Sequence, residues 1–245
     1  LDEFFRVRMA ALQRIAPIGK RTTTTLGHGV GETLNAVNER VIELQSRYNE
    51  AFEEVEAELA NECIDLMSED QLAEEQWEFV RTWFDRKVRP HLVPILISDV
   101  GVPELKDGTI YHAIALEGEV SKRARFALLE LPDHLDRFLV LPEKEGRHGI
   151  VFLDDVVRVG LPRLFSTFEP TAVSAFAIKV TRDAEIDMDD DLTKYLLEKM
   201  RKGIARRKKG DYVRFLYDRT MPDDLLKFLI RKLDVVDEAS IIPVS

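Results

Sequence analysis

The sequence is poor in the features that mark secreted and membrane-spanning proteins. Its 245 residues include one cysteine, Cys63, which excludes an internal disulfide and is typical of a reducing cytoplasm. No apolar run approaches the ~20 residues that a membrane-spanning helix needs. The opening residues, LDEFFRVR, carry charges from the second position and do not resemble a signal peptide. We therefore expect a cytoplasmic protein with no transmembrane segment.

Motifs of the common active sites are missing as well. The serines lack a GxSxG elbow, and no histidine has an HExxH spacing or a CxxC partner. Aspartates crowd residues 187–191, but they precede a predicted helix, whose dipole favours carboxylates, and the EF-hand spacing is absent. The residue patterns thus predict no metal site and no complete catalytic site. The histidines left without such a role are His28, His91, His112, His134 and His148.

The charge balance limits the possible partners. A formal net charge of -10 argues against a surface that binds polyanions as a whole. One basic run, over residues 199–209, contains no acidic residue and ends a predicted helix. It is interpreted first as a solvated face that complements the helix dipole, and second as a contact for phosphate groups. Because no aromatic residues are interleaved with it, we expect no nucleic-acid partner.

Residues 1–62 show the spacing of helices. Apolar residues recur on one side of Leu1 to Ile15, and a second helix is predicted from Glu32 to about Glu62. Its apolar residues, from Leu34 to Leu59, alternate at steps of three and four, which is typical of a packing seam. We expect an antiparallel hairpin that docks on another part of the chain. The GHGVG sequence between the helices lacks the Lys-Ser/Thr ending of a phosphate loop and is interpreted as a connection.

After Cys63 the pattern changes to short strands separated by helices. A Ser68–Gln71 capping box begins a helix that is predicted to continue to Val88, and Asp154 is predicted to cap a second one. Further helices are expected at 189–207 and 222–233. The predicted fold class is α+β: a helical hairpin at 1–62, then a two-layer domain at 63–245 with a mostly antiparallel sheet and covering helices. Its strands are expected at 94–97, 110–116, 124–131, 137–141, 150–153, 173–180 and 212–217.

The most function-like feature is the end of the strand at 173–180. Large apolar residues on one face and Ala175 and Ala177 on the other predict a strand buried on both faces, with a helix, 189–207, close to the small face. Polar residues follow at once, among them Thr181, Arg182 and Asp183. Polar groups at the end of a buried strand need partners, either each other or a ligand.

Several stretches together resemble one enzyme family. They are LDEFFRVRMAAL at 1–12, RFALLELP at 125–132, KVTRDAEIDMDDD at 179–191, VRFLYDRTMPDDLL at 213–226 and the closing SIIPVS. In this order they resemble polyphosphate kinase, which transfers the terminal phosphoryl group of ATP to inorganic polyphosphate. The resemblance implies the later part of the family's helical N-terminal domain and most of its head domain. Leu1, which opens within a helical pattern, also indicates a piece of a longer chain.

The resemblance implies that chemistry takes place elsewhere. The family's phosphorylated histidine and its metal-binding residues belong to C-terminal domains, so no catalytic residue and no metal ligand is expected in this chain. The longer enzyme is expected to use ATP and Mg²⁺ and to form a homo-oligomer through the head domain, whereas this chain alone is expected to be inactive and to bind no cofactor. The alternative is a stand-alone module for binding polyanions or for assembly.

Arg182 and Asp183 are the candidate substrate-binding residues. The arginine could face the channel for the phosphate chain, with Asp183 holding its guanidinium in place. The competing interpretation is a structural ion pair that terminates the strand.

Overall fold

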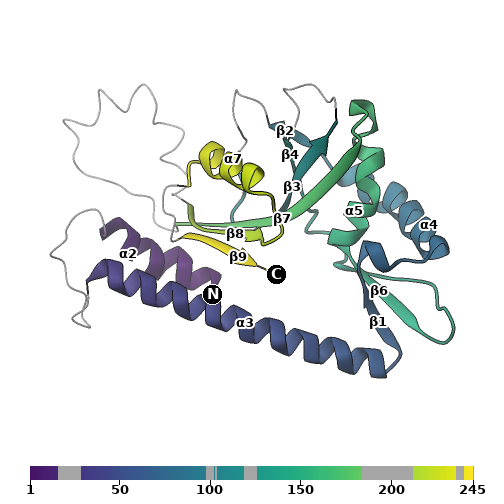
Figure 1. Cartoon of the computed structure of the whole chain (residues 1–245), viewed down its shortest axis with the longest axis horizontal. Coiled ribbons are helices and arrows are strands. Elements are labelled where there is room, and N and C mark those ends of the chain that lie inside the picture. The colour runs from purple at the N-terminus through teal and green to yellow at the C-terminus, as the bar shows by residue number, and fades with distance from the viewer. Residues whose placement is uncertain are drawn as a thin grey trace.

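The computed structural model describes residues 1–15, 29–97, 102, 104–118, 126–183, 212–235 and 240–244 (Figure 1). The predicted helix at 189–207, the basic run, the aspartates at 187–191 and most of the loop between the first two helices lie outside these ranges. Within them, none of the helices combines the length and the apolar character that a membrane-spanning segment needs.

The N-terminal hairpin is present. The first helix is continuous, with α1 (Asp2–Phe4), a π-helical turn η1 (Phe5–Met9) and α2 (Ala10–Ile15), and the second is α3 (Val30–Asn61). The side chain of Glu32 accepts a hydrogen bond from the N–H of Gly29 at 3.2 Å, which satisfies a free donor at the start of α3. The first helix and α3 lie side by side in Figure 1, as the apolar spacing predicted.

Only part of the predicted seam is buried. Phe5 and Met9 pack with Leu34 and with Val213 and Ile242 of the sheet. Beyond Val41 the helix continues past this contact, and most of its apolar side chains are exposed. The prediction of a seam packed along the whole helix is therefore wrong for the C-terminal half of α3. The residues that it misplaced are Leu44, Tyr48, Phe52 and Val55.

A six-stranded sheet carries most of the second part of the chain. Its order is β2-β4-β3-β7-β8-β9, and all pairs are antiparallel except β8 with β9. The predicted hairpin of 110–116 and 124–131 is thus confirmed as β3 and β4. The strand β9 was not predicted, because its four residues include a proline. The strands are β2 (Ile95–Ile97), β3 (Ile110–Glu117), β4 (Phe126–Glu130), β7 (Ala172–Arg182), β8 (Tyr212–Asp218) and β9 (Ile241–Val244).

A second sheet holds the remaining strands. Its order is β1-β6-β5, with β1 (Ile64–Met67) parallel to β6 (His148–Phe152) and β5 (Phe138–Val140) antiparallel to it. The strand β1 follows directly on α3 and was missed, since its sequence, IDLM, shows no alternation. The α+β fold class is confirmed, with two sheets where the sequence suggested one.

Helices cover both faces of the larger sheet. On one face lie α4 (Glu74–Trp83), the π-helical turn η3 (Phe84–Val88) and α5 (Leu153–Leu164), and on the other lies α7 (Asp223–Leu233). Alternate residues of β3 serve the two cores: Ile114 packs toward α5 and Ala113 toward α7. The strand is therefore buried on both faces, as a central strand should be.

The strand β7 confirms the prediction at 173–180 and runs two residues further. Its second half is buried at Ile178 and Val180, but its first half is only half-buried, so full burial on both faces was wrong. On the small face, Ala175 packs against the core beside α5, and Lys179 contacts the N-terminal helix through Asp2. Two elements far apart in the sequence thus share that face.

Two helix starts differ from their predictions. In the predicted Ser68–Gln71 box the side chain of Gln71 accepts a hydrogen bond from the N–H of Ser68, but the box encloses only the 3-10 turn η2 (Glu69–Gln71), and α4 begins at Glu74. Asp154 lies inside the first turn of α5, whose cap position is Phe152. Its carboxylate contacts Arg137 and His112, so partners from the sheets have replaced the local cap.

Candidate functional site

Arg182 lies at the end of β7 with its side chain only 11% exposed. Its guanidinium pairs with Glu104 at 2.9 Å and donates to the backbone carbonyl of Leu105 at 3.2 Å. It also donates to the Tyr212 hydroxyl at 2.7 Å, and its Cζ lies 4.2 Å from the centre of that ring. These contacts join the strand end to the loop before β3 and to β8, in the manner of a structural ion pair. A role in binding substrate stays a prediction.

Asp183 joins the same strand end to the hairpin. Its side chain is 8% exposed, and its Oδ2 lies 3.4 Å from Nε of Arg14 in α2. A buried carboxylate needs a cation or several donors, and here the cation comes from a residue 169 positions earlier. The neighbourhood that the sequence predicted around Arg182 is therefore polar and buried, and it includes the N-terminal helix.

A second ion cluster lies under the same helix. Asp2 accepts hydrogen bonds from Lys179 of β7 at 2.7 Å and from Arg214 of β8 at 3.0 Å. Burial acts to raise the pKa of Asp2, but the hydrogen bond and charge of Lys179 and the charge of Arg214 outweigh it and hold the pKa below its ordinary value. The Arg214 side chain is 5% exposed, and its Cζ lies 4.5 Å from the centre of the Phe5 ring.

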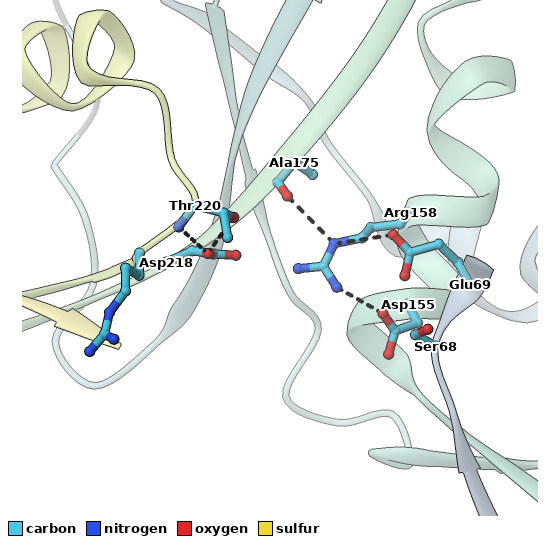
Figure 2. A pocket seen from close by; sticks show the side chains of 8 residues that line it. Ser68, Glu69, Asp155, Arg158, Ala175, Asp218 and Thr220 are labelled. Atoms are coloured by element: carbon cyan, nitrogen blue, oxygen red, sulfur yellow. Dashed lines mark hydrogen bonds and ion pairs between the residues drawn. The ribbon is translucent and has the colours of Figure 1, made fainter. Parts of the chain in front are cut away.

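A pocket of about 520 Å³ opens between the start of η2, α5 and the turn after β8 (Figure 2). At the turn, the carboxylate of Asp218 accepts hydrogen bonds from the N–H and the hydroxyl of Thr220. Three acidic and two basic side chains line the pocket, which does not suit a polyanion such as polyphosphate. The lining residues are Ser68, Glu69, Asp155, Arg158, Ala175, Asp218, Arg219 and Thr220.

Arg158 stands between two carboxyl groups in this pocket, as Figure 2 shows. Its Nη1 donates to Asp155 at 2.8 Å, and its Nε lies 3.8 Å from Glu69 and 3.4 Å from the carbonyl oxygen of Ala175. Burial, together with a hydrogen bond to Glu69, raises the pKa of Asp155 to about 7. The Asp155 carboxyl can therefore hold a proton near neutral pH, and it can exchange that proton or donate it to a polar ligand.

A buried histidine lies beside Asp154, the residue that precedes Asp155 in α5. His112 of β3 is fully buried, with its Nε2 3.6 Å from Asp154, which also pairs with Arg137 at 2.9 Å. Burial lowers the pKa of His112, so the ring is neutral at pH 7. Burial would raise the pKa of Asp154, yet His112 and Arg137 outweigh it and lower the value. This network fixes α5 on both sheets.

Sequence reasoning found the end of β7 but missed the pocket. The pocket is assembled from four segments that lie far apart in the sequence, and the one local signal was the i, i+3 pair of Asp155 and Arg158. Among the described residues, no group of three or more histidine, cysteine, aspartate or glutamate side chains is placed to hold a metal ion.

Two family models match the chain in sequence order. The model of the polyphosphate kinase N-terminal domain matches residues 1–67, and that of the polyphosphate kinase middle domain matches residues 75–244. The chain belongs to the polyphosphate kinase family. It is 35% identical over 250 residues to a polyphosphate kinase of Vibrio vulnificus and 33% identical to that of Escherichia coli K12, in each case over 99% of the chain. A polyphosphate kinase from Porphyromonas gingivalis has a similar crystal structure, with a TM-score of 0.75, 26% identity and 100% of this chain covered.

The chain spans about a third of the length of these polyphosphate kinases: 35% and 36% of the two bacterial sequences and 33% of the crystallised protein. The ion pairs of Asp2 and Arg14 join the two parts of the chain that the two family models match. Asp2 and Arg14 lie in the part matched by the N-terminal model, whereas Lys179, Asp183 and Arg214 lie in the part matched by the middle model. They connect the part of the chain matched by the N-terminal model with the part matched by the middle model.

Proposed function

We propose that this chain is the N-terminal and middle part of a polyphosphate kinase, which reversibly transfers the terminal phosphoryl group of ATP to inorganic polyphosphate. The observation that carries the proposal is the collinear match to two polyphosphate kinase domain models, over residues 1–67 and 75–244. In this proposal a phosphohistidine forms in other domains of the longer enzyme, and this chain alone is inactive.

His112 supports this division of labour. A histidine that accepts the terminal phosphoryl group must reach both ATP and the phosphate chain. His112 is fully buried and held beside Asp154, so neither substrate can reach it. His91, His134 and His148 are exposed, and they are left without this role because the proposal places the phosphohistidine in other domains.

Magnesium has no fitting ligands among the described residues of this chain. Mg²⁺ prefers carboxylates and phosphate oxygens in an octahedral arrangement. In the pocket, the carboxyl groups of Glu69 and Asp155 both already contact the cationic Arg158. We therefore derive no step of the reaction through a metal bound here, and the ion is expected to act with ATP in other domains.

The contribution proposed for this part is architectural. Arg182 and Asp183 are proposed to shape the wall that faces the phosphate chain, and the division into 1–62 and 63–245 is proposed as the domain boundary. The end of α3 at Asn61 and the left-handed backbone of Cys63, with φ of 60°, support that boundary. We also propose a cytoplasmic location and a homo-oligomer formed through the head domain.

A second candidate function is a binding or assembly module without catalysis. The exposed apolar residues on α3 favour it, because Tyr48 is 70% and Val55 51% exposed although both follow the helical seam spacing. Such a surface needs a partner, which can be another domain of the same enzyme.

The test is a chimera. This chain replaces the matching segment of the Vibrio vulnificus polyphosphate kinase, and ATP-dependent polyphosphate synthesis is compared with that of the parent enzyme and of this chain alone. The chimera should synthesise polyphosphate, and the chain alone should release no ADP above buffer. Steady turnover by the chain alone, or a folded chimera without activity, contradicts the proposal.

A further inference from the structure

His91 and His134 form an exposed pair that the kinase proposal does not use. They are 43 positions apart in the sequence, yet Nδ1 of His91 and Nε2 of His134 lie 3.2 Å apart. The ring centres are 4.6 Å apart at an interplanar angle of 73°. Two ring nitrogens that face each other on the surface can share a proton or share a metal ion.

Both histidines stand on short connections that the core holds in place. His91 ends the 3-10 turn η4 (Arg89–His91), which contains Pro90 and is followed by the buried Leu92. His134 lies in a turn between the buried Leu131 and the partly buried Leu135. These anchors belong to the same apolar core, so packing holds the two connections in place, and the exposed rings can adjust the distance between their nitrogens by side-chain rotation.

The distance suits a tetrahedral metal ion. With metal–nitrogen bonds of about 2.0–2.1 Å and a tetrahedral angle, two ligand nitrogens are separated by roughly 3.3–3.4 Å. The observed 3.2 Å differs from this by a small side-chain rotation. We propose that His91 and His134 bind a divalent transition-metal ion of the zinc class, with water completing its coordination.

Asp133 favours the tautomer that such a site needs. Its Oδ1 lies 3.8 Å from Nδ1 of His134, on the side of the ring away from His91. At this distance the carboxylate acts through its charge and not through a hydrogen bond, and its charge favours the tautomer with the proton on Nδ1 and a lone pair on Nε2. Arg89 lies in the 3-10 turn that carries His91, and Asp85 at 3.7 Å offsets its positive charge.

The donor set selects the ion. Neutral imidazole suits Zn²⁺, Ni²⁺ and Cu²⁺, whereas Mg²⁺ and Ca²⁺ prefer oxygen ligands. The site should therefore bind Zn²⁺ and Ni²⁺ in the presence of excess Mg²⁺. This selectivity separates it from any magnesium that accompanies ATP, and the proposal does not depend on the proposed kinase function.

Titration calorimetry of the chain with Zn²⁺ tests the proposal, with Mg²⁺ as the ion control. One site is expected in the wild type, and His91→Gln or His134→Gln should weaken zinc binding by about 10–100-fold or more, since removing a ligand costs at least as much as removing its supporting group. Asp133→Asn should weaken it less than either. His148→Gln is the matched control, because His148 is also exposed but is not part of the pair, and it should leave the affinity unchanged.

Thermal unfolding gives a second readout that does not depend on heats of binding. An ion that binds only the folded chain raises its Tm, so Zn²⁺ should raise the Tm of the wild type and of His148→Gln but not of His91→Gln. Wild-type affinity retained in both pair variants, or no zinc binding by the wild type, overturns the proposal. The latter result would mean that the two rings share only a proton.

Discussion

At the residue scale, Arg182 shows how a predicted binding residue can be part of the framework. Replacing it with alanine removes the guanidinium that pairs with Glu104 and donates to the hydroxyl of Tyr212, in a place where the arginine side chain is only 11% exposed. We expect Arg182→Ala to lower the free energy of unfolding by about 1.5–3 kcal/mol. Arg182→Lys should recover part of this, because lysine keeps the charge but lacks the planar fork. Urea unfolding measures both.

The control for Arg182 is Arg219→Ala, which removes an arginine that is exposed in the turn after β8 and should change stability by less than about 0.5 kcal/mol. The same variants in the chimeric kinase separate structure from function. Lost turnover per folded molecule, at normal stability, would show that Arg182 acts on substrate and that its ion pair is secondary.

Asp155 makes a prediction about pH. Its pKa of about 7 lies above the ordinary unfolded value of about 3.9, so the folded chain retains a proton that the unfolded chain has released. The contribution to stability is fully present below about pH 4 and is lost as pH rises toward 7. In Asp155→Asn the free energy of unfolding should not fall in this way. Its difference from the wild-type value should therefore change by about 1–3 kcal/mol between pH 4 and pH 7. Denaturant unfolding at several pH values measures it.

The matched control for Asp155 is Asp218→Asn, a carboxyl of the same pocket that is hydrogen-bonded within its own turn. The fall in stability should persist in this variant, because Asp155 and its contact with Arg158 are intact. If Asp155→Asn also leaves the slope unchanged, the proton retained by the folded chain is not on Asp155.

Residue-level prediction succeeded where a signal was local and failed where partners came from a distance. The polar residues at the end of β7, Thr181 and Arg182 with Asp183 after them, could be identified from the sequence alone. The partners of Arg182 could not, because Glu104 and Tyr212 precede and follow it by many positions. Asp154 showed the same limit: local chemistry predicted a cap, and tertiary contacts with Arg137 and His112 prevailed.

At the scale of elements, the close packing of α5 on η3 depends on one glycine. A Cβ added at Gly160 would lie 2.2 Å from Cζ of Phe84, whose ring is fully buried. The helices cannot keep their separation with any side chain there. We expect Gly160→Ala to lower the free energy of unfolding by about 1–3 kcal/mol, despite the better helix propensity of alanine. Thermal or urea unfolding measures the change.

Gly31→Ala is the control for the helix propensity of alanine, since nothing lies within 4 Å of its added Cβ and the residue is in α3. It should be neutral or stabilising by up to about 1 kcal/mol. Phe84→Leu combined with Gly160→Ala should cost less than the sum of the single changes. Additive costs would mean that the ring and the glycine do not interact.

Periodicity located elements better than it located their surroundings. The spacing of apolar residues found the helical hairpin and the hairpin of β3 and β4, because each pattern reflects the element itself. It did not show that α3 loses its contact with the rest of the chain after Val41. A helix has the same spacing of apolar residues whether or not a partner packs against them. Short strands such as β1 and β9 have too few residues for any period to be visible.

At the scale of the whole molecule, the order of the motifs identified the family and the fold class, whereas the way the parts join required the structure. The hairpin rests on β8 and β9 through the apolar cluster around Phe5, Met9 and Val213. Around that cluster lie the pairs of Asp2 and Arg14 with the sheet. No sequence pattern links residue 2 with residue 214, because their contact arises only when the chain is folded.

The junction between the hairpin and the sheet yields the last prediction. Asp2→Asn removes the carboxylate that faces Lys179 and Arg214, and the guanidinium of Arg214 is 5% exposed. A buried cation without its partner is strongly destabilising, but Asp2 itself is 45% exposed and water screens part of the loss, so we expect about 1–3 kcal/mol. The N-terminal helix should open first, and hydrogen exchange of residues 1–15 should accelerate more than that of β3.

The pH dependence and a neighbouring carboxylate make this test specific to the contact. Because the pKa of Asp2 is lowered in the folded chain, its contribution is present above the unfolded value of about 3.9 and is lost as pH falls through the folded one. The variant and the wild type should therefore converge in acid. Glu3→Gln removes the same charge from the same helical turn. Glu3 is 79% exposed and lies 3.9 Å from Arg6, so its replacement should lower the free energy of unfolding by less than about 0.5 kcal/mol. Equal losses in the two variants would assign the effect to the helix dipole, and the hairpin would then be held on the sheet by its apolar cluster alone.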